Sequence, residues 1–330
     1  MTEVSQGQTI EFSQDAADTR RLRHSTLGIS LDLGGAGSAW SLAHLHFGAP
    51  AFIAEILFAA STLWWAMVTG ARAPISGSRL AHLRKDFRSP TDGPLVAYIP
   101  VIGLLLISHY GPHLHKSLLS ILSIAFTAML ALVCARLLAF WLSGAVRLEQ
   151  IHPGYALPVI AGPFIASMTL ASAGFESLSL AAAAIGAFFW LTMGTIIFLR
   201  LLHGTELPAP LRPTLAVLVT PPATAGLAWF TLRNGAVDQV QISLAGIVVL
   251  LLLMQVFLAP IYLRGGFHIG WWAISFPAGA LASYAIRWAI GSPSLTSDVI
   301  AWVALIFATI LLIIFAAKTV LLATASIKRL

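Results

Sequence analysis

The feature that most constrains this chain is a series of long apolar segments, each about the length needed to cross a lipid bilayer. A transmembrane helix needs roughly 20 apolar residues, whereas a barrel strand needs only about ten. Only helices and closed barrels satisfy their backbone hydrogen bonds in lipid, and these segments are too long for barrel strands. We therefore predict an all-α polytopic membrane protein with ten transmembrane helices. The approximate bounds are 26–47, 51–71, 94–111, 117–144, 154–174, 178–202, 209–231, 239–262, 269–290 and 298–325.

The composition agrees with a membrane protein. Only 10% of the 330 residues are charged and 58% are hydrophobic, whereas soluble domains carry about 25% charged residues. The net charge of +6 does not indicate nucleic-acid binding, because the basic residues gather at the ends of the apolar segments. We expect a polar cytoplasmic tail over 1–25, a transmembrane domain over 26–325 and a short cytoplasmic C-terminus over 326–330.

Basic residues also predict the orientation in the membrane. Arginines such as Arg88, Arg200 and Arg264 fall on the same side as the N-terminus, whereas Lys116 and Arg233 fall on the other side. Because cytoplasmic loops carry an excess of lysine and arginine, both termini are expected in the cytoplasm. Residues 1–19 lack the basic start and apolar core of a signal peptide. We expect a bacterial inner (plasma) membrane protein.

Prolines divide the segments into two sets. The third, fifth, seventh and ninth segments contain internal prolines, and the first is rich in glycine, whereas the even segments have no proline in their interiors. Proline removes a backbone hydrogen bond, so such backbone belongs inside protein or beside water. We predict five helical hairpins, with the odd helices as an inner ring around a central path; the alternative is that these prolines serve packing alone. The candidate pore-lining or kink residues are Gly34, Gly37, Pro100, Pro163, Pro221, Pro277 and Gly279.

Three runs of sequence resemble a known family. They are GISLDLGGAGSAW (28–40), HPGYALPVIAGPFIAS (152–167) and, most specifically, WWAISFPAGALAS (271–283). The chain resembles the tellurite-resistance/dicarboxylate transporter family, which includes TehA-like bacterial proteins and the slow-type anion channels of plants. The resemblance covers essentially the whole chain in the number, order and length of its segments.

The resemblance implies ten helices as five hairpins, odd helices that line a pore, and a homotrimer with one pore per subunit. It also implies that Phe276 of the Ser-Phe-Pro motif plugs the pore near mid-membrane. An anion that loses its water beside a phenyl ring meets a barrier of several kcal/mol, because no polar group replaces its hydration. The alternative for Phe276 is a packing aromatic between helices.

Two pairs of ionisable residues are predicted inside or near the membrane. Intramembrane charges are costly and usually paired, so Asp32 with Arg136 and Glu55 with Arg287 are candidate ion pairs. Asp32 also departs from the family, which has a small residue at this position. The alternatives are that Asp32 titrates and couples protons to transport, or that the long side chains reach the interface.

Two other classes of site remain as minor alternatives. Histidines gather on the predicted outer side, where they would bind metal only if they converge; we expect interfacial histidines and no metal or other cofactor. Integral-membrane enzymes need paired carboxylates or a nucleophile with a base, and no such spacing occurs, so we expect no enzyme. The histidines are His44, His46, His109, His113 and His115.

The predicted function is a gated anion channel for small inorganic or carboxylate anions, closed by Phe276. The alternative is a proton-coupled secondary transporter of dicarboxylate or tellurite. The chain has no Gly-x-x-x-x-Gly-Lys-Ser/Thr loop for ATP, and no ring of lysine or arginine lies inside the odd segments. We expect anions to be attracted by backbone N–H groups at helix breaks and by positive helix ends.

Overall fold

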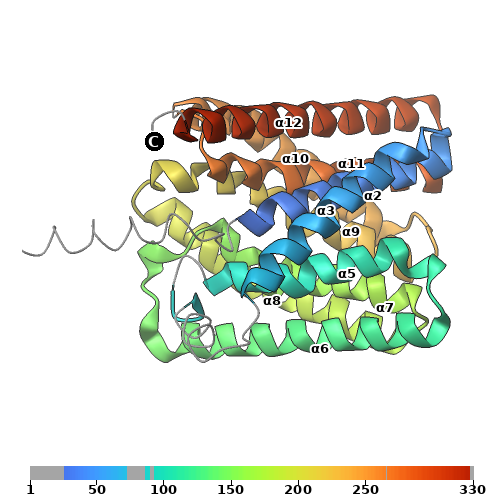
Figure 1. Ribbon diagram of the computed structural model, residues 1–330, viewed down its shortest axis with the longest axis horizontal. Coiled ribbons are helices and arrows are strands. Elements are labelled where there is room, and N and C mark those ends of the chain that lie inside the picture. The colour runs from blue at the N-terminus through green and yellow to red at the C-terminus, as the bar shows by residue number, and fades with distance from the viewer. Residues whose placement is uncertain (1–25, 73–85, 90–92, 265, 328–330) are drawn as a thin grey trace, which may run out of the picture.

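The structure is a computed structural model that describes residues 26–72, 86–89, 93–264 and 266–327, and within these ranges it is a bundle of helices (Figure 1). The predicted tail 1–25, most of the basic loop that contains Arg79 and Arg84, and residues 328–330 lie outside the described residues. The long helices are α2 (Leu27–Phe47), α3 (Ala51–Arg72), α5 (Tyr98–Tyr110), α6 (Lys116–Phe140), α7 (Gly162–Ser172), α8 (Glu176–His203), α9 (Thr220–Leu232), α10 (Gln239–Leu263), α11 (Ser275–Gly291) and α12 (Leu295–Ile327).

Ten helical traverses form five hairpins, as predicted. By length and composition, nine helical stretches of the described residues can cross a membrane. Helix α2 makes the remaining traverse: it has 21 residues, or about 31 Å at 1.5 Å per residue, and is less apolar because of its glycines and serines. The hairpin partners in contact are α2 with α3, α5 with α6, α7 with α8, α9 with α10, and α11 with α12.

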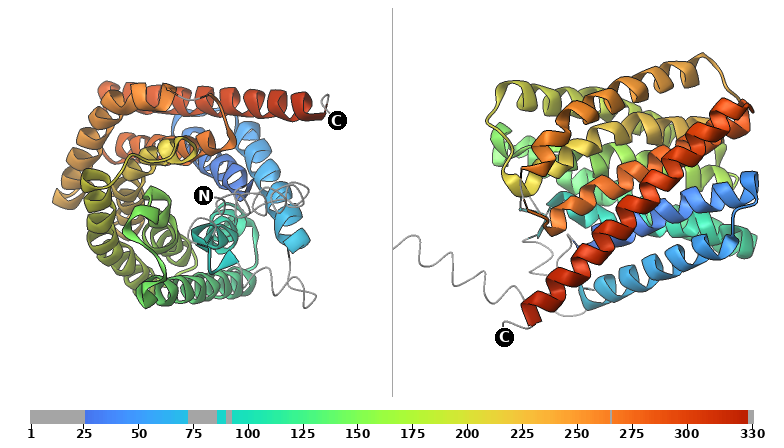
Figure 2. Two further views of the ribbon diagram at one scale, coloured as in Figure 1. Left: turned by 90° about the vertical axis from the view of Figure 1, so that its left-hand side faces the viewer. Right: turned by 90° about the horizontal axis from the view of Figure 1, so that it is seen from above.

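The odd member of each hairpin lies inside and the even member outside. Contacts between α2, α5, α7, α9 and α11 close a ring, and Figure 2 shows these helices enclosed by their partners when the bundle is viewed end on. In the traverses that contain α5, α7, α9 and α11, between 61 and 83% of the most apolar stretch is buried; in α3, α6, α8, α10 and α12 the share is 11 to 28%. The large apolar side chains that the outer helices expose are what lipid requires.

Four of the five inner traverses are not single α-helices, whereas α2 is one. Each of these four begins with a short 3₁₀ or π stretch, and the regular α-helix starts within the span. The short stretches are η2 (Gly93–Ala97) before α5, η6 (Pro153–Tyr155) and η7 (Leu157–Ala161) before α7, η8 (Ala209–Val219) before α9 and η9 (Ile269–Ile274) before α11. The other short elements are η3 (Gly111–His113), η4 (Trp141–Ala145) and η5 (Leu148–Gln150).

The prolines explain these breaks. Pro100, Pro163, Pro221 and Pro277 all lie in the first turn of the α-helix that follows the break. Proline is tolerated there because the first backbone N–H groups of a helix have no intrahelical partner. The prolines therefore start new helices inside the span. All four are among the candidate kink residues of the sequence, and a kink at these positions stays a prediction.

Glycines let the two rings approach closely. A Cβ atom built at Gly103 of α5 would stand 2.1 Å from the Phe126 ring of α6, and one at Gly186 of α8 would stand 3.0 Å from the Phe164 ring of α7. Hydroxyl pairs add hydrogen bonds, for example from Ser61 Oγ to the Ser30 carbonyl oxygen at 2.7 Å. Small residues and hydroxyls of this kind are the usual packing elements between helices in lipid.

Candidate functional site

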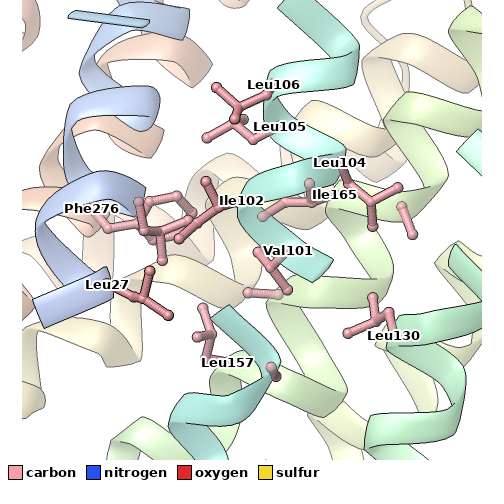
Figure 3. Close-up of a cluster of buried hydrophobic side chains, with 14 of the residues drawn as sticks. Leu27, Val101, Ile102, Leu104, Leu105, Leu106, Leu130, Leu157, Ile165 and Phe276 are labelled. Carbon is pink, nitrogen blue, oxygen red and sulfur yellow. The ribbon is translucent and has the colours of Figure 1, made fainter. Parts of the chain in front are cut away.

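The candidate site is the apolar centre of the inner ring, where Phe276 lies. Phe276 is the second residue of α11 and is only 8% exposed. Figure 3 shows its ring pointing into a cluster of aliphatic side chains from three other inner traverses. The cluster includes Leu27 and Leu31 of α2, Val101, Ile102 and Leu105 of α5, Leu157 of η7 and Ile165 of α7.

Two glycines bring α11 against α2 at this level. A Cβ atom at Gly279 would stand 2.9 Å from the Gly35 carbonyl carbon and 3.0 Å from the Ala36 nitrogen, so the two backbones touch. A Cβ atom at Gly35 would stand 3.0 Å from Cδ2 of Phe276. The phenyl ring therefore lies over the surface left bare by Gly35.

Asp32 lies beside the same residue. It is 3% exposed, and its carboxyl group accepts a hydrogen bond from the backbone N–H of Phe276. That N–H belongs to the first turn of α11, whose N-cap residue, Ile274, has no side-chain cap. A carboxyl group there is favoured by the positive end of the helix. The Oδ2 atom of Asp32 has no hydrogen-bond partner.

The structure forms neither of the two predicted ion pairs. The Arg136 guanidinium lies 6.0 Å from the ring centroid of Phe87, on the exposed side of the outer helix α6, whereas Asp32 is inside the inner ring. Because Asp32 is buried on an inner helix and Arg136 is exposed on an outer helix, the two side chains do not form an ion pair. Glu55 instead meets His109, with 3.2 Å between Oε1 and Nε2.

Arg287, the predicted partner of Glu55, lies on the inner ring. It is eleven residues after Phe276 on α11, and at 100° per residue the two side chains differ by about 20° around the helix axis. The helix rises about 16 Å between them. Arg287 therefore shares the Phe276 face of α11 and is half-buried near the far end of the helix.

The other predicted lining residues fall into two groups. A Cβ atom at Gly37 would meet the Phe58 ring of α3 at 2.8 Å, and one at Gly34 would meet Leu105 at 2.7 Å and the Ser61 hydroxyl at 3.3 Å. These two glycines therefore allow close packing with neighbouring helices. Gly37 faces the outer helix α3, so the expectation that it lines the path is corrected. Pro100, Pro163 and Pro221 are buried at the helix starts described above.

The histidines do not converge. His46 Nε2 lies 3.2 Å from Asp298 Oδ1, His44 Nδ1 lies 2.7 Å from the Ala49 carbonyl oxygen, and the His109 ring stacks on Phe58. Among the residues that the structure describes, no group of three or more His, Cys, Asp or Glu side chains is placed to hold a metal ion.

Sequence reasoning missed two histidines that start inner traverses. His152 Nδ1 accepts a hydrogen bond from the Gly154 N–H at 3.2 Å, and His268 Nδ1 accepts one from the Gly270 N–H at 3.1 Å. Both rings pack over their glycine, where a Cβ atom would stand 2.7 to 2.9 Å away. The shared signal is His-x-Gly immediately before an inner traverse.

These features define a class: a helical membrane protein with a ring of five inner helices and a cluster of apolar side chains at its centre. The family model described as SLAC1, voltage-dependent anion channel, matches residues 22–323. The chain belongs to this family, which confirms the resemblance to bacterial TehA-like proteins and plant anion channels.

Individual proteins that are similar to this chain agree with the family match. The tellurite resistance protein TehA homolog of Haemophilus influenzae is 24% identical over 261 residues, which are 78% of either chain. The S-type anion channel SLAH4 of Arabidopsis thaliana is 27% identical over 240 residues, 71% of this chain and 64% of SLAH4. The guard cell S-type anion channel SLAC1 of the same plant is 24% identical over 163 residues, 49% of this chain and 29% of the relative. The chain thus spans less than two thirds of these plant relatives.

Proposed function

We propose that this protein is a gated anion channel in which the Phe276 ring closes a path along the inner ring. The observation that carries the proposal is the burial of Phe276 among aliphatic side chains from α2, α5 and α7. A hydrated anion cannot pass such a cluster without losing water, and no polar side chain of the cluster replaces that water, so the barrier is several kcal/mol.

Selectivity for anions has two sources in this proposal. The α-helices α5, α7 and α9 start inside the span with N-cap residues that provide no side-chain cap, so in this proposal their positive ends attract a negative ion. The first turn of α11 is different, because Asp32 accepts the hydrogen bond of its Phe276 N–H. Arg287 adds a full positive charge on the Phe276 face of α11.

Opening requires the ring to leave the cluster while α11 stays in place. Ala278, Gly279 and Ala280 follow Phe276, and Gly35 faces its ring, so no bulky neighbour on α11 or at position 35 holds the ring. A side-chain rotation is therefore the simplest opening movement, and the backbone contact between Gly279 and Gly35 is kept.

The second candidate is a proton-coupled carrier of dicarboxylate or tellurite. A specific observation favours it: the buried carboxyl group of Asp32 lies directly against the backbone of Phe276, where the gain or loss of a proton would act on the plug. The Haemophilus relative is named for tellurite resistance, whereas the plant relatives are named as anion channels.

The remaining expectations belong to the proposal as well. We place the protein in a bacterial inner membrane as a homotrimer, with both termini in the cytoplasm. Within the described residues, Arg200, Arg212 and Arg264 lie at the ends of traverses on the N-terminal side, which supports this orientation by the positive-inside rule.

Flux in reconstituted vesicles tests this function. Vesicles that contain the Phe276→Ala variant are given a chloride gradient, and the membrane potential and internal pH are followed with separate dyes. A channel produces a potential near the chloride equilibrium potential with no change in internal pH. A pH change that follows the anion gradient would instead establish the coupled carrier.

A further inference from the structure

A cavity of about 340 Å³ lies outside the inner ring, between α8, η8 and α10. We call it the α8–α10 groove. It lies toward the ends of α8 and α10 that are on the N-terminal side of the bundle.

The walls of the groove are apolar and open toward the outside of the bundle. Leu202 of α8 is 75% exposed and Phe198 is 40% exposed, while Met254 and Leu258 of α10 are half-buried within the lining. Because α8 and α10 are outer helices, this opening lies on the outer surface of the bundle.

Three arginines line the same groove: Arg200, Arg212 and Arg264. Glu206 is the single carboxylate in the lining; it is 83% exposed in its side chain and lies 3.5 Å from Arg212. The groove therefore carries a net positive charge at one end.

The Arg200 guanidinium has one N–H group that is free to donate a hydrogen bond to a further acceptor. It is only 2% exposed, and it donates through Nη1 to the Thr205 carbonyl oxygen at 2.6 Å and through Nη2 to the Glu149 carbonyl oxygen at 3.3 Å. Its Nε–H has no partner. A buried guanidinium N–H without an acceptor is costly, and a bound anionic oxygen would remove that cost.

The length of the groove matches one leaflet. Met254 precedes Arg264 by ten residues on α10, which is about 15 Å along the helix. The hydrocarbon core of a bilayer is about 30 Å thick. The groove thus has an apolar wall about half a bilayer deep and guanidinium groups at its end on the N-terminal side. This arrangement fits a phospholipid whose acyl chain lies along the wall and whose phosphate lies at the arginines.

We propose that the α8–α10 groove binds one anionic phospholipid from the leaflet on the N-terminal side. The headgroup phosphate meets the three arginines, and an acyl chain lies along Phe198, Leu258 and Met254. Basic pockets between transmembrane helices are typical sites for anionic headgroups.

Thermal unfolding in detergent tests the proposal. Purified protein is heated with added phosphatidylglycerol, phosphatidylcholine or inorganic phosphate. We expect phosphatidylglycerol to raise the melting temperature by several degrees more than phosphatidylcholine, and phosphate to have no effect. Arg264→Gln should at least halve the difference between the two lipids, and Leu258→Trp, which fills the apolar wall, should do the same.

Arg147→Gln is the matched control, because it removes an exposed arginine on the same side that does not line the groove; it should keep the full difference. Equal stabilisation by both lipids, or a full difference in Arg264→Gln, would overturn the proposal. A shift with inorganic phosphate alone would show a site for free anions, and an oligomer that dissociates in Leu258→Trp would show that a second copy occupies the groove. Both outcomes contradict the lipid assignment.

Discussion

The Phe276 ring rests on Gly35: a Cβ atom at position 35 would stand 3.0 Å from Cδ2 and 3.4 Å from Cε2 of the ring. One turn further along α11, Gly279 touches the backbone of Gly35 itself. The Phe276 ring and the contact between the first and last inner helices, α2 and α11, are therefore parts of one packing unit.

The backbone contact predicts a large effect at Gly279. Gly279→Ala should destabilise the protein by about 1–3 kcal/mol, because a methyl group there meets backbone atoms that cannot move aside. Gly246→Ala is the control: a Cβ atom at this α10 position meets nothing within 4 Å, and alanine should stabilise a helix interior by about 0.5–1 kcal/mol. Unfolding of both variants in detergent checks this, and equal effects would contradict the close packing.

Asp32 should limit the anion current when the plug is absent. In the Phe276→Ala background, Asp32→Asn keeps an acceptor for the backbone N–H but removes a negative charge beside the path. We expect the chloride current to rise several-fold, because repulsion of the anion is removed. Current recorded under voltage clamp provides the check, with Asp298→Asn as a control at the end of α12. An unchanged current would mean that Asp32 carries no charge in the open pore.

Arg287 should attract anions to the far end of the path. In the same background, Arg287→Gln should reduce the chloride current at low salt and have less effect at high salt, since the Debye length is only about 3 Å at 1 M. Arg287→Lys should restore the current. Arg233→Gln removes a charge that already faces Asp238, with 3.8 Å between Nε and Oδ2, and should change little. A salt-independent loss in Arg287→Gln would indicate a packing defect.

His152 should make the fold sensitive to acid. Burial, and secondly the positive charge of Arg200, lower the pKa of His152 from 6.5 to about 4. His152 therefore binds a proton more readily in the unfolded chain than in the folded protein. Its contribution to the free energy of unfolding is fully present above about pH 6.5 and is lost as the pH drops toward 4. The loss is about 3 kcal/mol at most. The protonated ring also cannot accept the Gly154 N–H.

Melting temperatures between pH 7 and pH 4 measure this effect. His152→Asn keeps a side-chain acceptor and does not titrate, so its profile should be flatter than that of the wild type. His203→Asn changes an exposed histidine at the end of α8 and should follow the wild type. If His152→Asn loses stability with acid as steeply as the wild type, His152 is not the group that titrates.

Much of the fold can be predicted from the sequence because backbone groups in lipid must be hydrogen-bonded within the protein. Apolar length identifies the traverses, and Pro100 and Pro277 mark the segments that cannot face lipid. The 3₁₀ and π stretches before those prolines could not be predicted, because they depend on where neighbouring side chains replace the lost hydrogen bonds. Cys134 of α6, for example, donates to the Pro158 carbonyl oxygen at 3.0 Å.

The candidate site is predictable only in part. Phe276 is identified by its motif, whereas the partners of charged residues depend on how each helix is rotated. Both predicted pairs were wrong for this reason: Arg136 is turned toward Phe87, and Glu55 toward His109. Asp32 is bound to a backbone N–H, which no spacing of side chains in the sequence could reveal.

The most direct test of the account compares currents of the wild type, Phe276→Ala and Phe164→Ala in chloride under voltage clamp. Phe164 is also a buried phenylalanine on an inner helix, but it packs toward Gly186 of α8, away from the path. The account predicts a nearly silent wild type, a large current in Phe276→Ala and a silent Phe164→Ala. A silent Phe276→Ala that folds and reaches the membrane, or equal currents in both variants, would contradict the claim that Phe276 closes the path.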